Sequence, residues 1–492
     1  MTATQGNRTT QAFGIEPSAN TEPTGSTFYL SPNSIASWGP EVERLTRDPL
    51  GPNIMPEAGT VIRTMAKAAF DGDFIRDHFR AFTDGLLRCA WSTTPRRYYP
   101  TSVRSTDFVV SANGALAEGT LIIVRGCAKA ANNGLKVVGA GSDATHIVAS
   151  GLTAETFSSG QGVTVEVCGF QFTTGDAQID ADGNLIATTA DLTTLGLTVG
   201  QKVWIGGATT ATKFATASDR GEARVSVIAA GKLTLENKVS GTLATADNGS
   251  GKTIQIFFGQ MLKVSPTTAA AYQEPTYQVE VGLATIDSGS PMYEYVTGCA
   301  AASGRLSFPT SAKATMALTF EGQGTVDPTG TRRTAFAAPL AQNARALMNT
   351  GSHVVRGTLS SSAGAALTGV ITSVDLAVDN AVQVNYGHGQ NAPVLTTMGD
   401  CAVNVTVGAF FEKYGIVVAM QADDTCSATW TMRCAGDAWG VGFDLPAVQI
   451  MSAPKSVSAT APVSLAIGLR SVRDPIYNTT LIVSDFPYLP AP

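Results

Sequence analysis

The feature that most constrains the fold is a short strand pattern that occurs twice. Residues 296–324 contain Val-Thr-Gly, a strand, a Pro-Thr-Ser turn, a second strand and a Gly-Gln-Gly end. Residues 367–389 contain Leu-Thr-Gly, a strand, an Asp-Asn turn, a second strand and a Gly-His-Gly end. Because self-similarity within a chain is the signature of a repeated structural unit, we predict that one β-unit occurs twice.

The composition is that of a strand-rich and weakly charged chain. Of the 492 residues 15% are charged, against about 25% in an average soluble domain. The net charge is −6, so no overall basic field favours nucleic acid. The first 20 residues lack the apolar core of a signal peptide. The chain contains no run of 18 or more apolar residues, so no transmembrane helix is predicted.

The residues that carry chemistry are scattered. The seven cysteines are odd in number and form no CxxC pair, so we interpret them as small buried apolar side chains. The four histidines lack ligand spacing. The Gly249–Lys252 segment resembles a phosphate loop, but Ala246 stands where that loop needs glycine. We therefore predict no catalytic, cofactor-binding or metal-binding residue, and no enzyme.

The N-terminal part of the chain has two open interpretations. Residues 1–25 are rich in Thr, Gly, Asn and Pro, which predicts either a disordered tail or an arm that orders on a neighbouring subunit. A short strand is expected at residues 27–30. Residues 37–53 have the composition of a long loop of mixed charge, which is either bound by a partner or a solvated connector.

A strand and a helix follow this loop. Residues 59–68 alternate between polar and apolar, which predicts a strand. Asp71 or Asp73 is expected to cap a helix whose apolar face includes Phe74, Phe79 and Phe82. His78 lies on or beside that face, and we expect it to be packed rather than a ligand.

Residues 107–265 are predicted to be an insertion. Residues 119–138 and 200–227 form a second weak repeat of strands, and Asn133-Gly134 is a strong turn signal. One or two small β-modules are expected here, since surface loops tolerate insertions at low entropic cost.

The C-terminal part is predicted to be mainly β. Residues 341–348 are a candidate short helix. Residues 403–420 contain a strand, a turn or short helix, and a strand at 416–418. Further strands are predicted at residues 428–433, 442–450, 463–469 and 480–484.

The order of these features resembles the major tail tube proteins of long, non-contractile-tailed bacteriophages (siphophages). The resemblance covers most of residues 26–490. It rests on the following features in order: the charged loop with Arg44 and Arg47, the strand before a Phe-rich helix ending at Leu86-Leu87, Tyr295–Cys299, Asn349-Thr350, Leu367–Val370, Phe443-x-Leu445-Pro446 and Ser471–Pro475.

The resemblance implies a mainly β chain with two β-sandwich or barrel tube domains, each with a short flanking helix, and one or more inserted β-domains. The expected division is an arm at residues 1–36, a discontinuous first tube domain at 37–106 and 266–335, inserted outer modules at 107–265, and a second tube domain at 336–492. With two domains per chain, a ring of three chains with pseudo-six-fold symmetry is favoured over a hexamer.

The resemblance also implies function and partners. The chain would form stacked rings of a virion tail, a conduit for DNA ejection that does not bind the DNA specifically, after synthesis in the bacterial host cytoplasm. Expected partners are other copies, the tape measure, the terminator and the distal tail proteins, with no membrane and no cofactor. The candidate assembly residues are Trp38, Glu43, Arg44, Arg47, Thr297, Gly298, Thr368 and Gly369.

Two alternatives stay open at this point. One is a capsid or tail decoration protein. The other is a carbohydrate-binding or hydrolytic virion protein, which would need exposed aromatic side chains with paired carboxylates.

Overall fold

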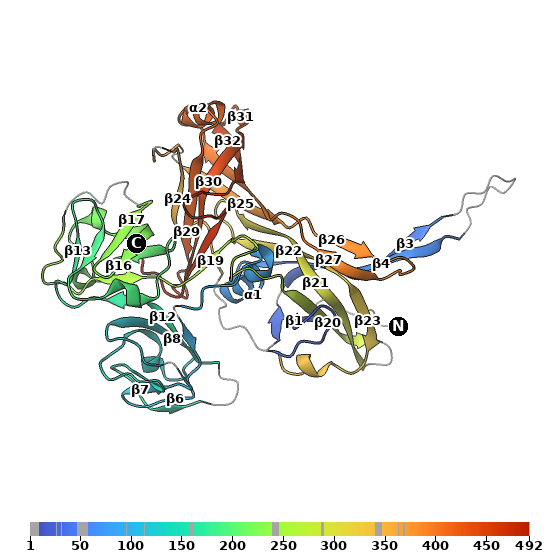
Figure 1. Ribbon diagram of the computed structural model, residues 1–492, viewed down its shortest axis with the longest axis horizontal. Coiled ribbons are helices and arrows are strands. Elements are labelled where there is room, and N and C mark those ends of the chain that lie inside the picture. The colour runs from blue at the N-terminus through green and yellow to red at the C-terminus, as the bar shows by residue number, and fades with distance from the viewer. Residues whose placement is uncertain are drawn as a thin grey trace.

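The fold is mainly β, as predicted, with 51% of residues in strands, and the described part of the chain contains two α-helices. The structure is a computed structural model that describes residues 9–491 except 26, 31, 47–57, 95, 113, 158–161, 239–245, 287–289, 340–346, 363 and 368–369. Every strand pairing in this part of the chain is antiparallel, and Figure 1 shows the arrangement.

The first group of elements, which we call the first unit, comes from two separate parts of the chain. Its elements are β1 (Thr9–Glu16), β2 (Phe28–Leu30), β3 (Pro32–Leu45), β4 (Thr60–Asp73), α1 (Arg76–Leu87), β20 (Thr276–Ile286), β21 (Ser290–Phe308), β22 (Thr315–Gly322) and β23 (Gly324–Thr329), followed by the 3-10 turn η6 (Thr334–Phe336).

The second group, which we call the second unit, is continuous in sequence. Its elements are β24 (Val354–Ser360), β25 (Ile371–Asp379), β26 (Gln383–Tyr386), β27 (Pro393–Thr397), β28 (Ala402–Phe410), α2 (Gly415–Gln421), β29 (Cys426–Arg433), β30 (Gly440–Ser452), β31 (Lys455–Ser458) and β32 (Ala461–Ser471).

The two units are joined edge to edge in one sheet. The C-terminal half of β21 pairs with β25 over six residues, from Ser303 opposite Asp379 to Phe308 opposite Val374. One hydrophobic cluster runs through both units and includes Phe74, Leu306 and Leu376. The junction therefore contains both a backbone ladder and a shared core.

Both units use the same strand connections. In the first unit, β3 and β4 form a hairpin that leads into α1, and β20, β21 and β22 follow after the inserted segment. In the second unit, β25 and β28 pair and lead into α2, and β29, β30 and β32 follow. The pairings β4–β22, β20–β21 and β1–β20 correspond to β28–β32, β29–β30 and β24–β29.

The correspondence extends to single residues. The amide of Phe74 donates to Ala314 O at 2.9 Å, and the amide of Phe411 donates to Val463 O at 2.9 Å. With these two residues aligned, three register shifts fall at matching positions in the two units. They are Ala301/Ser303 with Ile450/Ser452, Tyr277/Val279 with Cys426/Ala428, and Pro32/Ser34 with Ile371/Ser373. Because β-bulges are specific local features, three shared bulges identify the two units as structural copies.

This correspondence corrects the repeat predicted from the sequence. The first copy, residues 296–324, does form the β21–β22 hairpin. In the second copy, however, β26 pairs with β27 and not with β25. The structural counterpart of β21–β22 is β30–β32, because these strands have corresponding pairing partners and register shifts. The sequence pattern suggested a different copy because alternating strands and glycine-rich turns resemble one another in sequence.

Three groups of local predictions were also wrong. Residues 37–45 are not loop but belong to β3, which pairs with β4 along its length because that neighbour satisfies its backbone despite Gly39 and Pro40. The segment before Gly25 contains β1, which pairs with β20 far along the chain and buries Ala12 and Phe13.

The third concerns the helices. Helix α1 begins after Ile75 without a side-chain cap, since β4 continues through both predicted capping aspartates. Residues 416–418, predicted as a strand, lie in α2. Most of the candidate helix at 341–348 lies outside the described residues. His78 is buried, as expected.

The segment between α1 and β20, which we call the inserted segment and which begins before the boundary predicted at residue 107, contains two sheets of its own. Strands β6 (Ser102–Val103), β7 (Asp107–Val109), β10 (His146–Val148) and β11 (Glu155–Thr156) form the smaller sheet. The larger one contains β5 (Arg97–Tyr98), β8 (Thr120–Arg125), β9 (Gly134–Val137), β12 (Thr164–Gln171), β13 (Ala177–Ile179), β14 (Leu185–Ala187), β15 (Lys202–Ile205), β16 (Gly221–Ala229), β17 (Lys232–Glu236) and β18 (Gln255–Phe257).

The inserted segment has two hydrophobic cores. One includes Phe108 and Val165, and the other includes Phe172 and Leu233. Figure 1 shows the corresponding two lobes, one around β6 and β7 and one around β13 and β16.

The remaining elements are four 3-10 turns and two strands. The turns are η2 (Ala130–Asn132), η3 (Leu192–Leu195), η4 (Thr210–Thr212) and η5 (Ala217–Asp219). The strands β19 (Gln260–Lys263) and β33 (Ile482–Phe486) pair with each other.

We predict that Asn380, at the end of the β21–β25 junction, stabilises the contact between the units. Its fully buried amide donates to Leu86 O and Ala301 O, both at 2.9 Å. Asn380→Ala leaves two buried carbonyls without this donor, so the free energy of unfolding should fall by about 1–3 kcal/mol. Chemical denaturation measures the loss. The exposed Asn385→Ala serves as the control and should change stability by less than about 0.5 kcal/mol.

Candidate assembly surfaces

One face of the joined sheet carries small polar side chains. Along β22, Met316, Leu318 and Phe320 are buried, whereas the residues between them point to the opposite face. The same alternation holds in β25, β28 and β32. One row across six paired strands contains Asp71, Ala317, Arg305, Ala377, Asn404 and Arg470.

Several positive charges on this face are neutralised by carboxylates. Lys313 Nζ lies 2.7 Å from Asp73, and Arg305 lies 3.3 Å from Asp375. Although partial burial raises the pKa of Asp73, the hydrogen bond from Lys313 and its charge outweigh this and lower it. A surface of Ala, Gly, Ser and Thr with paired charges offers few sites that would hold phosphate groups.

A long hairpin projects from the sheet. The C-terminal part of β3 and the N-terminal part of β4 extend away from the rest of both units, as Figure 1 shows. The shorter hairpin β26–β27 lies against them, where Thr64 N donates to Asn391 O at 2.8 Å. Val42 and Leu45 of β3 are exposed, with Leu45 at 64%. Exposed apolar side chains on a projecting hairpin are suited to contact with another molecule.

The structure places three of the candidate assembly residues on this hairpin. Trp38 Nε1 donates to Glu294 Oε2 at 2.6 Å. Glu43 lies 3.5 Å from Arg63 across the hairpin, and Arg44 is exposed beyond it.

Thr297 and Gly298 lie elsewhere, in the interior of the first unit. Thr297 Oγ1 donates to Asn20 Oδ1 at 2.8 Å. Gly298, at φ +61°, donates its amide to the carboxylate of Glu16 at 3.0 and 3.1 Å. These contacts attach the segment after β1 to β21. Arg47, Thr368 and Gly369 lie outside the described residues.

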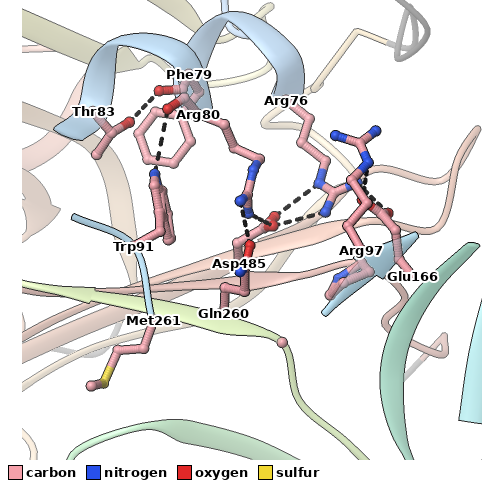
Figure 2. Close-up of polar contacts among 12 residues, drawn as sticks. Arg76, Phe79, Arg80, Thr83, Trp91, Arg97, Glu166, Gln260, Met261 and Asp485 are labelled. Carbon is pink, nitrogen blue, oxygen red and sulfur yellow. Dashed lines mark hydrogen bonds and ion pairs between the residues drawn. The ribbon is translucent and has the colours of Figure 1, made fainter. Parts of the chain in front are cut away.

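A buried ion cluster attaches the inserted segment to the units (Figure 2). Arg76 of α1 donates to both oxygens of Asp485 in β33, at 2.9 and 2.8 Å, and to Glu166 of β12 at 2.7 Å. Arg97 Nε lies 2.9 Å from Glu166, and Arg80 also contacts Asp485. The cluster therefore joins a helix of the first unit, a strand near the C-terminus and the inserted segment.

A second cluster joins the other lobe to the second unit. Glu222 lies 2.9 Å from Lys202 and 3.3 Å from Arg356 of β24. Close by, Arg224 of β16 lies 2.7 Å from Asp444 of β30. With two separate ionic attachments, the inserted segment is fixed to both units.

The electrostatics of the clusters are set by competition between burial and charge. Burial raises the pKa of Glu166, but Arg76 and then Arg97 outweigh it and hold that pKa below its usual range. Asp485 follows the same pattern, with burial opposed by Arg76 and Arg80. These carboxylates are therefore ionised at neutral pH, which a buried ion cluster requires.

Sequence reasoning missed both clusters. Their charged residues lie far apart in the chain, as with Arg76, Glu166 and Asp485. The one available signal is a carboxylate within an otherwise apolar strand, such as Glu166 in Val165–Val167. No group of three or more His, Cys, Asp or Glu in the described residues could hold a metal ion.

The comparison with protein families is decisive for the class of protein. A family model described as phage tail tube protein matches residues 213–465, just over half of the 492 residues. The chain belongs to the phage tail tube protein family. The match runs from the larger lobe of the inserted segment, through the second half of the first unit, to β32. No curated protein matches the chain significantly.

Membership of this family identifies a structural protein of the phage tail. A tail tube protein assembles with copies of itself and other tail components, so the exposed hairpin and sheet edges are candidate contact surfaces. Within the described part of this tube protein, no helix is both long and apolar enough to cross a membrane.

We predict that removing Arg76 destabilises the protein in a pH-dependent way. Arg76→Met leaves Glu166 and Asp485 buried with fewer cations, which costs about 3–5 kcal/mol at neutral pH. Because both carboxylates have lowered pKa values, their contribution to stability is present above the unfolded pKa of about 4 and is lost at lower pH.

Without Arg76, burial is opposed by fewer cations, so the pKa values of Glu166 and Asp485 should rise in the variant. Protonation can then relieve the unpaired charge at pH 5 but not at pH 8, and the variant should lose less stability at pH 5 than at pH 8. Denaturant unfolding at both values measures this. Arg63→Met removes the exposed pair with Glu43 and should cost less than about 1 kcal/mol. Equal losses for Arg76→Met at pH 5 and pH 8 would contradict the proposed cause.

Proposed function

We propose that this chain polymerises into stacked rings that form the tail tube of a long-tailed, non-contractile phage, a conduit through which DNA passes. Each chain would supply two tube domains, the first and second units, and three chains would close a ring with pseudo-six-fold symmetry. The inserted segment would lie on the outside. In this proposal the first domain begins at β1, before the boundary predicted from the sequence.

The observation that supports the proposal most strongly is the junction between two corresponding units. A closed ring needs a heterologous contact that repeats with a fixed rotation. The β21–β25 ladder is such a contact made inside one chain. If the same contact forms between chains, two units per chain give six nearly equivalent units from three chains.

The polar sheet face supports the conduit. In a ring built from these units, one face of the continuous sheet would line the channel. Arg305 and Lys313 on that face are paired with carboxylates, and a net charge of −6 gives no attraction for phosphate groups. DNA would therefore slide through without specific binding.

The projecting hairpins support axial stacking. The β3–β4 hairpin reaches well beyond the units in Figure 1, and its exposed apolar residues would contact the next ring. We propose the tape measure, terminator and distal tail proteins as further partners, because a tube must be measured in length and closed at both ends. Synthesis would occur in the host cytoplasm before assembly.

Electron microscopy and mass measurement test the ring. Purified protein should form rings or tubes with a central hole. The ring mass should be three times the chain mass of 50.9 kDa. Rings of six chains would contradict the proposed stoichiometry but not the tube. A protein that stays monomeric at high concentration, with no ring under any assembly condition, would count against the tube itself.

The axial contact is tested by placing two negative charges on the exposed face of β3. Val42→Asp combined with Leu45→Asp should leave the monomer's melting temperature unchanged within about 2 °C, because both side chains are exposed. Rings should still form, but tubes should shorten at least tenfold as counted in micrographs. Val227→Asp, at an exposed valine of the inserted segment, is the matched control and should give tubes of normal length.

A further inference from the structure

The contact that the second unit makes with the first defines a groove. At the junction, a groove of about 400 Å³ is lined by the start of β25, by β24 and by the turn after β21. Phe308, the last residue of β21, packs there and is 4% exposed. Thr310 in the turn donates to Thr372 O at 2.5 Å. The end of one hairpin therefore lies against two strands of the neighbouring unit and forms one wall of the groove.

The corresponding hairpin end in the second unit has no such cover. The alignment of the two units places Val457 of β31 where β21 has Phe308. Val457 is 74% exposed, although its counterpart is buried. Within the described residues, β31 pairs only with β32, so its other backbone edge is open. Among the described residues, no further unit packs against this hairpin end as the second unit packs against the end of β21.

The first unit has the complementary open groove. A space of about 670 Å³ is lined by the start of β3, by β1 and by β2. These strand starts correspond to the β25 and β24 parts of the junction groove, with Pro32 aligned to Ile371 and Gln11 to Gly357. The outer edge of β3 is the counterpart of the β25 edge that pairs with β21.

A buried polar group in this groove lacks partners. Gln11 is 3% exposed, and neither its amide nitrogen nor its amide oxygen has a hydrogen-bond partner among the described residues. Leaving such a group unsatisfied costs about 1–3 kcal/mol. Backbone groups of an entering hairpin turn would satisfy it.

From these observations we propose that β31 of one chain pairs antiparallel with β3 of a second copy of this chain, and that Val457 and the turn after it occupy the groove beside Gln11. The register follows from the β21–β25 ladder, with β3 matched to β25 through their partner strands β4 and β28, because β3 has an additional register shift between Ile35 and Ser37. Ser456 lies opposite Ser37 of the partner subunit, as Ser307 lies opposite Asp375. Ser452 lies opposite Glu41 of the partner subunit. This contact rests on the proposed function and specifies its lateral interface.

The side chains at this contact are compatible. Lys455 lies with its ammonium 4.0 Å from the ring centre of Phe411 and 4.7 Å from that of Tyr414. In the proposed register it meets Trp38 of the partner subunit, whose indole contacts Glu294. A cation beside aromatic rings and a carboxylate is favourable.

Prolines at the contact reduce the number of backbone hydrogen bonds that the two strand edges can form. Pro454 and Pro40 each remove one backbone donor from the paired edges. Proline on an edge strand discourages unregulated strand addition. The groove and the hairpin end must therefore fit together for the edges to pair.

Disulfide crosslinking in assembled rings tests the register. Ser37→Cys with Ser456→Cys in one chain should give covalent dimers and trimers on a non-reducing gel, because opposite residues in a ladder lie within disulfide reach. Ser307→Cys with Asp375→Cys should crosslink inside the chain without a change in size. Glu43→Cys with Ser456→Cys, displaced by roughly 20 Å along β3, should not crosslink.

Two further variants test the groove. Val457→Asp should leave the melting temperature of the monomer unchanged and reduce ring formation at least tenfold. Ile476→Asp, at an equally exposed site away from the contact, should not reduce it. Gln11→Leu, which removes the unpaired amide, should weaken rings less than Val457→Asp.

The outcomes separate the contact from the function. Covalent trimers only with the Ser37 and Ser456 pair, together with loss of rings in Val457→Asp, support the contact. Rings or tubes without that crosslink, while the pair at Ser307 and Asp375 closes, would overturn the contact and leave the tube function in place. Unsubstituted protein that forms no ring would overturn both.

Discussion

The structure depends on one backbone ladder, in which the end of β21 pairs with the start of β25. This ladder places two corresponding units side by side with their polar faces continuous. It also buries the end of one hairpin, at Phe308, in the neighbouring unit. Because the ladder is antiparallel and the units are alike, the same geometry can repeat beyond the chain, which is the property that an assembling tube protein needs.

The correspondence between the units is preserved in the places where strands deviate from regular pairing. Shared bulges at Ala302 and Met451, for example, occur although the side chains differ. A bulge changes strand twist and direction, so its conservation within the chain preserves the curvature of the sheet. Sequence identity between the units is not needed for this, because backbone geometry and the alternation of buried residues define the sheet.

The inserted segment is held differently from the units. Its lobes have their own cores, and their attachment relies on buried charges such as Glu166 and Glu222, each paired with cations from other segments. Buried ion pairs of this kind orient the lobes relative to the units, because the attraction between the charges offsets their desolvation cost only in one geometry. The arrangement fixes the lobes without extending the sheet that carries the polar face.

The sequence by itself determined the fold class, the strands with clear alternation and the helix after β4, since each depends on local periodicity and turn residues. It did not reveal β1, the length of β3 or the true repeat, because those depend on partners such as β20 and β4 that lie elsewhere in the chain or across a long hairpin. Thr297 and Gly298, singled out for assembly, hold Glu16 and Asn20 inside the first unit. Only the tertiary structure decided which edges stay open, because an edge is defined by the absence of a neighbour and no local pattern encodes that.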